Sequence, residues 1–144
     1  MDAIDEELIV KMDKGTIRSS MLSKRLGLPA STTHFRIKRL EKEGIIKGYK
    51  GEIDWKKAGF PLEAFIFVNI DVDLLKSIKK TQDRLLKELL AIMYVREGYI
   101  ITGDSDILIR VMARDTEHLK EILLNSIDAK EGVVKTHTTI ILSN

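Results

Sequence analysis

The sequence of 144 residues contains no cysteine and only two prolines, and aromatic residues make up 6% of it. The lack of cysteine excludes a disulfide framework, a thiol nucleophile and any cysteine-based zinc site. The longest apolar run, residues 89–95, is seven residues long, far short of the ~20 that span a bilayer. The acidic N-terminus is unlike the basic start of a signal peptide. We therefore expect a soluble, cytoplasmic protein with no membrane partner.

Charge is nearly balanced over the whole chain but is unevenly distributed along it. Lysine and arginine number 24 and aspartate and glutamate 22, which gives a net charge of +2. Residues 14–50 carry ten basic and two acidic side chains, a net of +8, whereas residues 61–144 carry a net of −2. A basic segment of this kind is typical of proteins that bind the nucleic-acid backbone. The two ends of the chain are therefore expected to have different roles.

Hydrophobic residues make up 44% of the chain, enough for a packed core, and their period predicts three helices near the N-terminus. The first ends at Lys14-Gly15, the second covers about residues 20–26 and ends at Gly27, and the third covers residues 31–43. Ser31 is the expected N-cap of the third helix. A short helix, a glycine-containing turn and a capped second helix form the helix–turn–helix that docks in the DNA major groove.

The hydrophobic period changes after Gly44. Isoleucine, tyrosine and glycine over residues 45–53 predict a short β-hairpin, a wing. Lys47 and Lys50 flank this hairpin, and they serve either to contact phosphates or simply to keep the surface soluble. The sequence Gly-Phe-Pro at 59–61 is the predicted domain boundary, because proline cannot continue a helix or a strand ladder. The predicted domains are therefore residues 1–60 and 61–144.

The second domain alternates between strand and helix patterns. The predicted elements are a strand over 62–72, a helix over 74–90, strands over 94–102 and 107–114, a helix over 115–127 and a strand over 133–142. This β-α-β-β-α-β order is that of a ferredoxin-like domain. The expected fold class is therefore α+β, with a winged helix–turn–helix followed by a ferredoxin-like domain.

The third helix carries the strongest functional signal. A helical wheel turns Thr33, Ile37 and Leu40 inward. The remaining side chains lie outward or at the flanks: Ser31, Thr32, His34, Phe35, Arg36, Lys38, Arg39 and Lys42. Such a face is either merely solvated or a DNA-binding surface, and the basic segment and the outward Phe35 favour DNA. An exposed aromatic ring is costly unless it covers an apolar group, and a thymine methyl is one candidate.

Two features of the second domain have alternative interpretations. The sequence 103–106, Gly-Asp-Ser-Asp, resembles fragments of a cation site or of a hydrolase motif, but the rest of each pattern is missing. It is equally well explained as a plain hairpin turn. In the last strand, Thr136 and Thr138 share one face, where they either hold a small zwitterion or act as β-branched fillers at a sheet edge.

Nothing in the sequence assembles a catalytic or metal centre. His34, His118 and His137 show no metal-ligand spacing, and His118 is expected to face solvent. No nucleophile, base and orienting group come together in one motif. We therefore expect no enzyme activity, no metal and no cofactor.

The chain resembles the leucine-responsive/asparagine regulatory (Lrp/AsnC) family of bacterial and archaeal transcription regulators over nearly its whole length. Residues 2–9, 22–28 and 36–49 are similar to the family's first helix, its first DNA-binding helix with the turn, and its recognition helix with the wing; residues 102–106 and 134–138 match its small-molecule-sensing domain. The stretch 36–49 is the most specific of these. Phe35 stands where the family usually has a polar or basic residue, which predicts a different operator.

The resemblance implies a winged helix–turn–helix joined by a linker strand to a sensing and oligomerisation domain. It also implies a homodimer built sheet to sheet, often assembled into tetramers or octamers, and an amino acid or related metabolite as effector between sensing domains. The effector positions carried over to this chain are Thr102, Gly103, Asp104, Asp106, Thr136 and Thr138. Their carboxylates suit an ammonium group, and their hydroxyls suit a carboxylate.

The sequence therefore predicts a transcription regulator that binds double-stranded DNA sequence-specifically, with helix 31–43 in the major groove of a pseudo-palindromic operator and with its activity modulated by the effector. The predicted phosphate contacts are Lys24, Arg25, Lys47 and Lys50, and the predicted base readers are His34, Phe35, Lys38 and Arg39, with Ser31, Thr32 and Arg36 beside them. Two alternatives stay open: an architectural protein that coats DNA with low sequence specificity, and a metabolite-binding module whose helical domain only docks partners.

Overall fold

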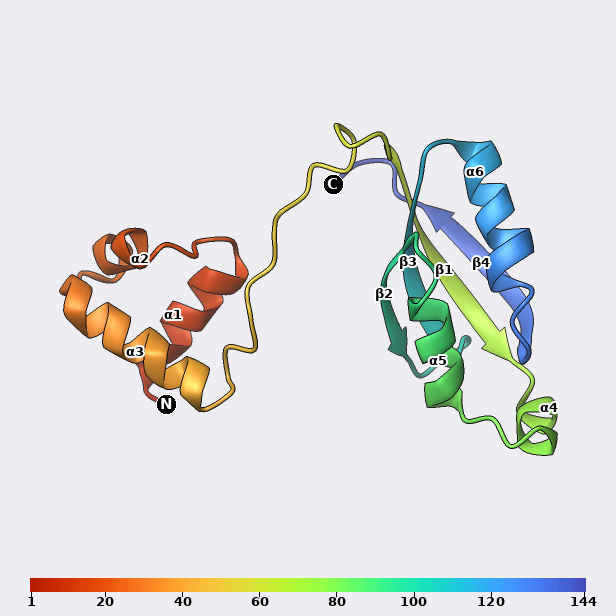
Figure 1. The fold of residues 1–144 in the computed structure, drawn as a ribbon, viewed down its shortest axis with the longest axis horizontal. Helices are drawn as coiled ribbons and strands as arrows, with labels where there is room; N and C mark the ends of the chain where they lie inside the picture. The colour runs from red at the N-terminus through yellow and green to blue at the C-terminus, as the bar shows by residue number, and fades with distance from the viewer. The chain divides into compact units, whose positions relative to one another are not determined.

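The computed structural model describes all residues, Met1–Asn144, which form two compact units, Met1–Glu52 and Ile53–Asn144 (Figure 1). We expected the boundary at residues 59–61. Residues 53–60 instead belong to the second unit, because their aromatic side chains pack on it. The ring of Phe60 lies 5.8 Å from that of Tyr94, and the guanidinium of Arg96 lies 4.9 Å from the centre of the Trp55 ring.

The first unit consists of three helices, as the sequence predicts. They are α1 (Ala3–Asp13), α2 (Ser19–Leu26) and α3 (Ala30–Lys42). Gly27 ends α2 in the left-handed conformation, with φ of 65°, which glycine adopts without steric cost. The buried core of the unit consists of Leu8, Leu22, Ile37 and Leu40. The stripe predicted for α3 is therefore confirmed.

Two local predictions for the first unit are wrong. Helix α3 begins at Ala30 with Pro29 in the N-cap position, so the Ser31 hydroxyl does not cap it. The segment 47–54 has no regular secondary structure, so the expected hairpin does not form. Gly48 and Gly51 weaken a strand at this place, and an isolated two-stranded hairpin is only marginally stable.

The second unit contains one antiparallel sheet of four strands. The strands are β1 (Leu62–Ile70), β2 (Val95–Ile100), β3 (Ile107–Ala113) and β4 (Val133–Ile140). Their order in the sheet is β2-β3-β1-β4, with β1 hydrogen-bonded to both β3 and β4. The predicted order of strands along the chain is confirmed.

The predicted helix over residues 74–90 is two helices, α4 (Val72–Ser77) and α5 (Gln82–Leu90). The helix is interrupted between them because Lys79 adopts a positive φ of 55° and because the Thr81 hydroxyl caps α5 by accepting the N–H of Arg84 at 3.1 Å. The last helix, α6 (Thr116–Glu121), continues into a π-helical segment, η1 (Ile122–Ile127). None of these helices combines the length and apolar character that a membrane crossing requires.

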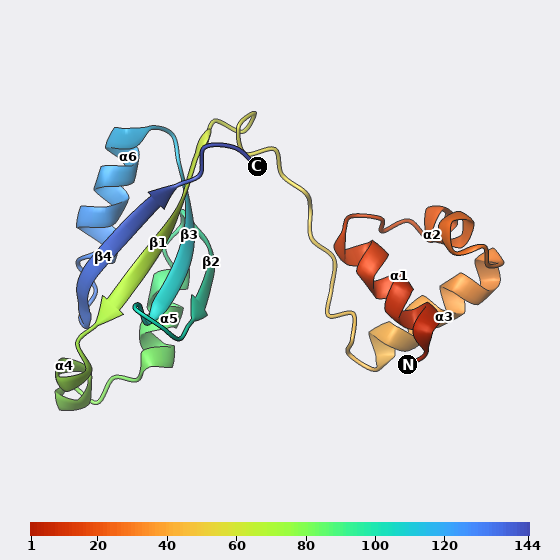
Figure 2. The ribbon, with the colours of Figure 1, turned by 180° about the vertical axis from the view of Figure 1, so that it is seen from behind.

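Helices α5 and α6 lie on one face of the sheet and leave the other face without a helix (Figures 1 and 2). Alternation along β1 follows this division, because Ala64, Ile66 and Val68 are fully buried whereas Phe65 and Phe67 between them are only partly buried. The helices contribute six more side chains to this core: Leu75, Leu85, Leu89, Leu119, Ile122 and Ile127. The uncovered face therefore presents aromatic side chains.

Candidate nucleic-acid interface and effector loop

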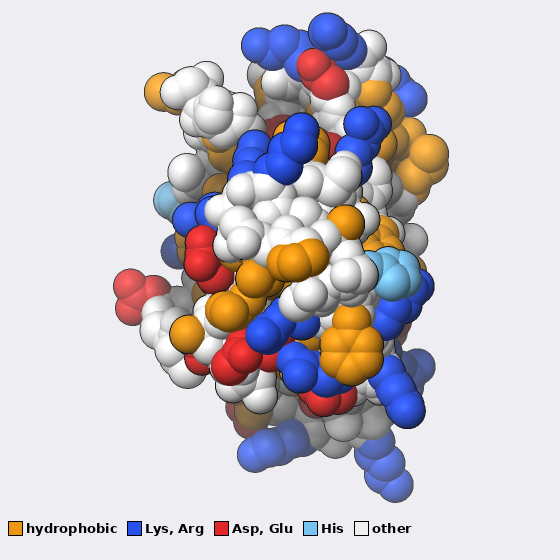
Figure 3. Space-filling view, turned by 90° about the vertical axis from the view of Figure 1, so that its left-hand side faces the viewer, with side chains coloured by type: hydrophobic (Ala, Val, Ile, Leu, Met, Phe, Trp, Pro, Cys, Tyr) orange, Lys and Arg blue, Asp and Glu red, His pale blue; other side chains and the backbone are white.

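The turn between α2 and α3 is short and well hydrogen-bonded. The N–H of Leu28 donates to the carbonyl of Ser23 at 3.0 Å, and the hydroxyl of the buried Thr33 donates to the carbonyl of Pro29 at 3.2 Å. The buried side of α3 is thereby held on the core. The opposite side of α3 carries exposed side chains: Ser31, His34, Phe35, Lys38 and Lys42. On the side of the protein turned to the viewer in Figure 3, Lys and Arg side chains lie beside hydrophobic ones, with a few Asp and Glu side chains among them.

A buried carboxylate of α1 holds the two arginines of α3. The side chain of Asp5 is 1% exposed, and Nη1 of Arg36 lies 2.9 Å from its Oδ1. The same Nη1 lies 2.9 Å from Oδ2 of Asp2, the residue that caps α1. Nη2 of Arg39 forms an ion pair with the second oxygen of Asp5. Both guanidinium groups are thus engaged within the first unit.

These contacts change the acidity of both carboxylates. Burial acts to raise the pKa of Asp5, but hydrogen bonds from Arg36 and from the Asp2 N–H, together with the charge of Arg39, outweigh it and lower the pKa. The Asp5 N–H, followed by Arg36, lowers the pKa of Asp2 to about 2. Both groups therefore carry a negative charge at neutral pH, and the ion-pair network between α1 and α3 is intact there.

Sequence reasoning missed this network. Asp2 and Asp5 form a capping box at the start of α1, and their spacing of three residues was the available signal. Their pairing with Arg36 and Arg39 spans more than thirty positions of the chain. The sequence alone therefore did not show that these two arginines face α1.

The remaining predicted DNA contacts divide by their surroundings. Lys24, Lys47 and Lys50 are exposed and take part in no ion pair, whereas Nη1 of Arg25 donates to the Thr16 hydroxyl at 2.5 Å. Lys38 is 61% exposed at its side chain, and its Nζ lies 3.4 Å from Glu41. Thr32 is partly buried. No carboxylate pairs with Lys24, Lys47 or Lys50, nor with Arg25, whose one side-chain hydrogen bond is to a neutral hydroxyl, so these four cations remain free to meet phosphates.

The segment that follows α3 returns to that helix although it forms no hairpin. The hydroxyl of Tyr49 donates to Oε1 of Glu41 at 2.6 Å. This bond lowers the pKa of Glu41 and raises that of Tyr49, because it stabilises the charged carboxylate and the neutral phenol. Lys47 and Lys50 flank Tyr49 in sequence, so this contact keeps their backbone near the C-terminal end of α3.

The loop between β2 and β3 carries the Gly-Asp-Ser-Asp sequence and is anchored to β1. The N–H of Asp106 donates to the carbonyl of Val68 at 3.0 Å, and its Oδ2 accepts the N–H of Ile70 at 2.9 Å. Gly103 has φ of 109°, a conformation that favours glycine. Asp106 therefore has a structural role in holding the loop.

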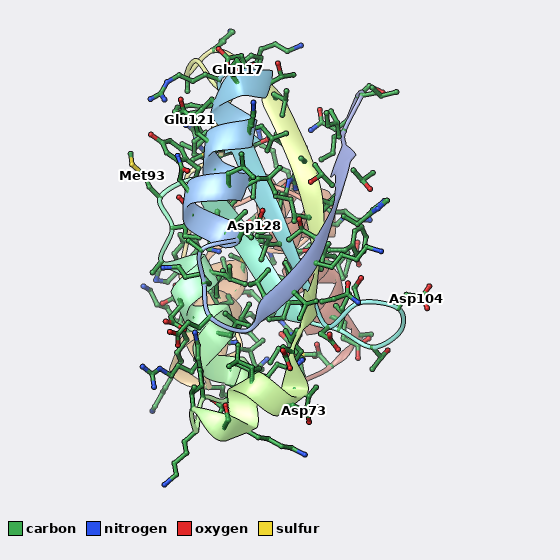
Figure 4. The ribbon with its side chains drawn as sticks, turned by 90° about the vertical axis from the view of Figure 1, so that its right-hand side faces the viewer. Asp73, Met93, Asp104, Glu117, Glu121 and Asp128 are labelled. Atoms are coloured by element: carbon green, nitrogen blue, oxygen red, sulfur yellow. The ribbon has the colours of Figure 1, made fainter.

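Asn69, which sequence reasoning also missed, braces the tip of this loop. Its Nδ2 donates to the carbonyl of Asp104 at 2.9 Å, and the hydroxyl of Ser105 donates to its Oδ1 at 3.2 Å. The side chain of Asp104 points away from the sheet (Figure 4), and Thr102 and Gly103 are also exposed. No local sequence pattern connects residue 69 with this loop. Asp104 is therefore the carboxylate of the loop that a ligand meets without displacing an internal bond.

The two threonines of β4 lie on the helix-covered face of the sheet. Thr136 pairs with Val68 and Thr138 with Ile66, and both are partly buried. Asp106 bonds to Val68 from the β3 side, so the backbones of Asp106 and Thr136 flank the same residue at two strand spacings, about 10 Å. The structure thus brings these two predicted effector residues to one level of the sheet. A cavity of about 320 Å³ lies elsewhere in the unit, lined by Ile78, Lys80, Arg84, Glu88, Ala129, Lys130 and Glu131.

We expected His118 to face solvent, but it is partly buried and packs on an aromatic ring. Its ring lies edge-on at 4.4 Å from that of Tyr94, and its Nδ1 accepts the N–H of Arg114 at 3.0 Å. The Arg114 guanidinium lies 4.9 Å from the centre of the Phe60 ring. His118 therefore belongs to the aromatic cluster that holds residues 53–60 on the second unit.

A helix–turn–helix unit followed by an α+β unit with a four-stranded sheet defines a class of DNA-binding transcription regulators with a separate ligand-binding domain. Residues 12–47 match the model of winged helix–turn–helix DNA-binding domains, and residues 63–144 match that of the Lrp/AsnC ligand binding domain. The chain belongs to the Lrp/AsnC family.

Similar proteins come from archaea and bacteria. The chain is 32% identical over 141 residues to an uncharacterised HTH-type transcriptional regulator of Pyrococcus furiosus, covering 97% of this chain and 91% of that one. It is 30% identical over 150 residues to the regulatory protein AsnC of Escherichia coli, with 98% and 95% covered. The AsnC structure superposes with a TM-score of 0.76 at 26% identity, covering 100% and 93%.

A third similar protein has been solved with a ligand. The feast or famine regulatory protein from M. tuberculosis, complexed with L-methionine, superposes with a TM-score of 0.78 at 28% identity, covering 99% of this chain and 92% of that one. These matches extend over both the helix–turn–helix unit and the α+β unit.

Proposed function

We propose that this chain regulates transcription by placing α3 in the major groove of a pseudo-palindromic operator. The observation that carries the proposal is the outward face of α3, where Ser31, His34, Phe35 and Lys38 are exposed while the opposite side packs on the core. Side chains of a helix that follows such a turn reach base edges. Lys24, Arg25, Lys47 and Lys50 contact phosphates and set the register.

The proposal gives Arg36 and Arg39 a different role from that predicted by the sequence. Their guanidinium groups pair with Asp2 and Asp5, so we propose that they brace α3 against α1 and that the side chains around Phe35 read the bases. Thr32, partly buried at the N-terminal end of α3, borders this reading face.

We propose that the uncovered face of the sheet forms a homodimer, on which tetramers or octamers are built. Phe65, Phe67 and Leu108 are only partly buried there, and no helix covers them. Aromatic rings that are partly exposed on a sheet face are stabilised when an equivalent face of a second copy covers them. Two copies present two recognition helices to half-sites about one helical turn, ~34 Å, apart.

We also propose that an amino acid binds the second unit as an effector. The M. tuberculosis relative complexed with L-methionine supports this proposal, as do the exposed carboxylate of Asp104 and the hydroxyls of Thr136 and Thr138. Thr102 and Gly103 border Asp104, and Asp106 holds the loop in place. A thermal-shift screen of the twenty amino acids is expected to show stabilisation by at least one of them, and Asp104→Asn is expected to weaken it. No stabilisation at millimolar concentration would contradict an amino-acid effector.

Selection of bound duplexes from a random DNA pool tests the proposed DNA function. We expect a pseudo-palindromic consensus, and a different yield when the amino-acid effector is added. If the protein binds selected and random DNA with similar affinity at fixed salt, it is instead an architectural protein that coats DNA with low sequence specificity. That alternative rests on the unpaired lysines, since phosphate contacts carry no sequence information.

The salt dependence of operator binding tests the phosphate contacts separately. Each lost contact lowers the magnitude of the negative slope of log K against log salt by about 0.9, so Lys47→Ala is expected to make the slope less negative by that amount. Lys120→Ala, an exposed change on α6 of the second unit, is the matched control and is expected to leave the slope unchanged. An unchanged slope in Lys47→Ala would remove Lys47 from the interface.

A further inference from the structure

Phe35 is the most exposed aromatic side chain of the first unit. It is 67% exposed and takes part in none of the ring–ring contacts of the protein. Tyr49, the other aromatic residue of the unit, is 52% exposed but donates its hydroxyl to Glu41. Phe35 has no such partner, and leaving its ring in water is unfavourable. The free protein therefore keeps an apolar group exposed at the centre of its basic helix.

The ion pairs of α1 determine what surrounds this ring. On a helix, the neighbours of position 35 are the residues three and four places away, here Ser31, Thr32, Lys38 and Arg39. The Arg39 guanidinium is turned to the buried Asp5. The ring is thus left between the exposed Ser31 and Lys38, and no guanidinium extends past it on the outward face.

The chemistry of the ring limits what it is able to recognise in DNA. Phenylalanine has no hydrogen-bond donor or acceptor, so it cannot read the polar groups of a base edge. The one apolar group that a base pair presents in the major groove is the C5-methyl of thymine. We infer that Phe35 contacts a thymine methyl group in each half-site and thereby determines part of the operator sequence. This inference rests on the proposed function, since it requires α3 to lie in the major groove.

The experiment removes the methyl group without changing base pairing. Each thymine of the selected operator is replaced in turn by deoxyuridine, and the affinity of the full-length protein is measured by fluorescence anisotropy at fixed salt. We expect one position in each half-site at which uracil weakens binding by the wild-type protein about fourfold, the factor expected for one buried methyl group. In Phe35→Ala the same replacement is expected to have no effect, and in Phe35→Leu to keep most of it.

A second pair of duplexes separates the methyl group from the rest of the base. At the same position, 5-methylcytosine is expected to bind the wild-type protein more tightly than cytosine, and Phe35→Ala is expected to bind both equally. Circular dichroism of the variants checks the fold, which an exposed substitution should leave intact.

The outcomes distinguish the inference from the proposed function. If the protein binds no DNA, both are overturned. If the wild-type protein instead selects an operator and loses no more affinity than Phe35→Ala does when any thymine is replaced by uracil, only the inference on Phe35 is overturned. Two further results would also overturn it: a loss of bending or base unstacking in Phe35→Ala, which would identify the ring as a wedge between base pairs, and a changed oligomeric state without DNA, which would identify it as a contact between copies.

Discussion

The carboxylate of Asp5 in α1 lies 2.9 Å from Nη1 of Arg36 in α3 while its side chain is 1% exposed. A buried carboxylate is stabilised only when cations and donors compensate for its lost hydration. Here Arg36 and Arg39 provide that compensation, so their ion pairs link α3 to the first helix. The rigidity of the proposed reading face thus depends on a residue that does not itself face DNA.

Replacing Asp5 tests this dependence. Asp5→Ala is expected to lower the free energy of unfolding by about 3 kcal/mol, because it leaves two arginines without their buried partner. Asp13→Ala, an exposed change at the end of α1, is the control and is expected to stay within about 0.5 kcal/mol. Urea denaturation followed by circular dichroism measures both, and equal stabilities would contradict a structural role for Asp5.

The stability of the first unit is expected to fall in acid. The pKa values of Asp2 and Asp5 are lowered from 3.8 in the folded state, to about 2 for Asp2. Carboxylates with a depressed folded pKa stabilise the fold above the unfolded value, and this contribution is lost as the pH falls through the folded value. The thermal stability of the helical unit should therefore fall as the pH is lowered from about 4 to about 2. The doubly substituted variant Asp2→Asn, Asp5→Asn is expected to show a shallower dependence, and an equally steep one would exclude these groups as its source.

Substitution of Arg39 distinguishes a bracing role in the fold from a role in reading bases. If Arg39 braces α3, Arg39→Ala should lower the stability of the free protein in urea and weaken operator binding without dependence on any single base pair. If instead it reads guanine, the loss of about 1–3 kcal/mol should disappear when that one guanine is replaced. Competition binding with single-base operator variants at one salt concentration measures this dependence, and a loss confined to one guanine would contradict the bracing role.

Two glycines of the second unit allow backbone strain to be separated from crowding. Gly132 and Gly103 have similar positive φ values, 105° and 109°, but a Cβ at Gly132 would lie 2.5 Å from Cδ2 of Leu75, whereas one at Gly103 would have nothing within 4 Å. Gly103→Ala is expected to cost about 1 kcal/mol from backbone strain alone. Gly132→Ala should cost about 2 kcal/mol more through overpacking. Equal losses in chemical denaturation would mean that Leu75 moves aside freely.

Much of the fold followed from patterns within single elements. The three N-terminal helices, the four strands and their order along the chain were predicted because burial of one face imposes a period of 3.6 or 2 residues on the sequence. The predictions failed in segments where this hydrophobic period does not determine the secondary structure. The break at Lys79 and Thr81 divides a stripe that reads as one helix, and residues 45–53 have a strand-like composition but no partner to pair with.

The boundary between the units shows the same limit. Pro61 indicated a break at 59–61, but Trp55 and Phe60 pack beside Arg96, Tyr94 and Arg114 of the second unit. Composition gave no sign of this docking, because the partners are separated by more than thirty residues. The anchor of the linker therefore became visible only in the folded chain.

The sequence by itself determined the class of protein, since charge segregation, the glycine turn and the amphipathic third helix are local properties, and the family resemblance rests on contiguous motifs. Tertiary structure decided which of the basic side chains are free. On a helical wheel Arg39 points outward as Lys38 does and Arg36 lies at the flank. Only the packing of α1 on α3 brings Asp5 to the two arginines, because attraction between charges acts through space and not along the chain.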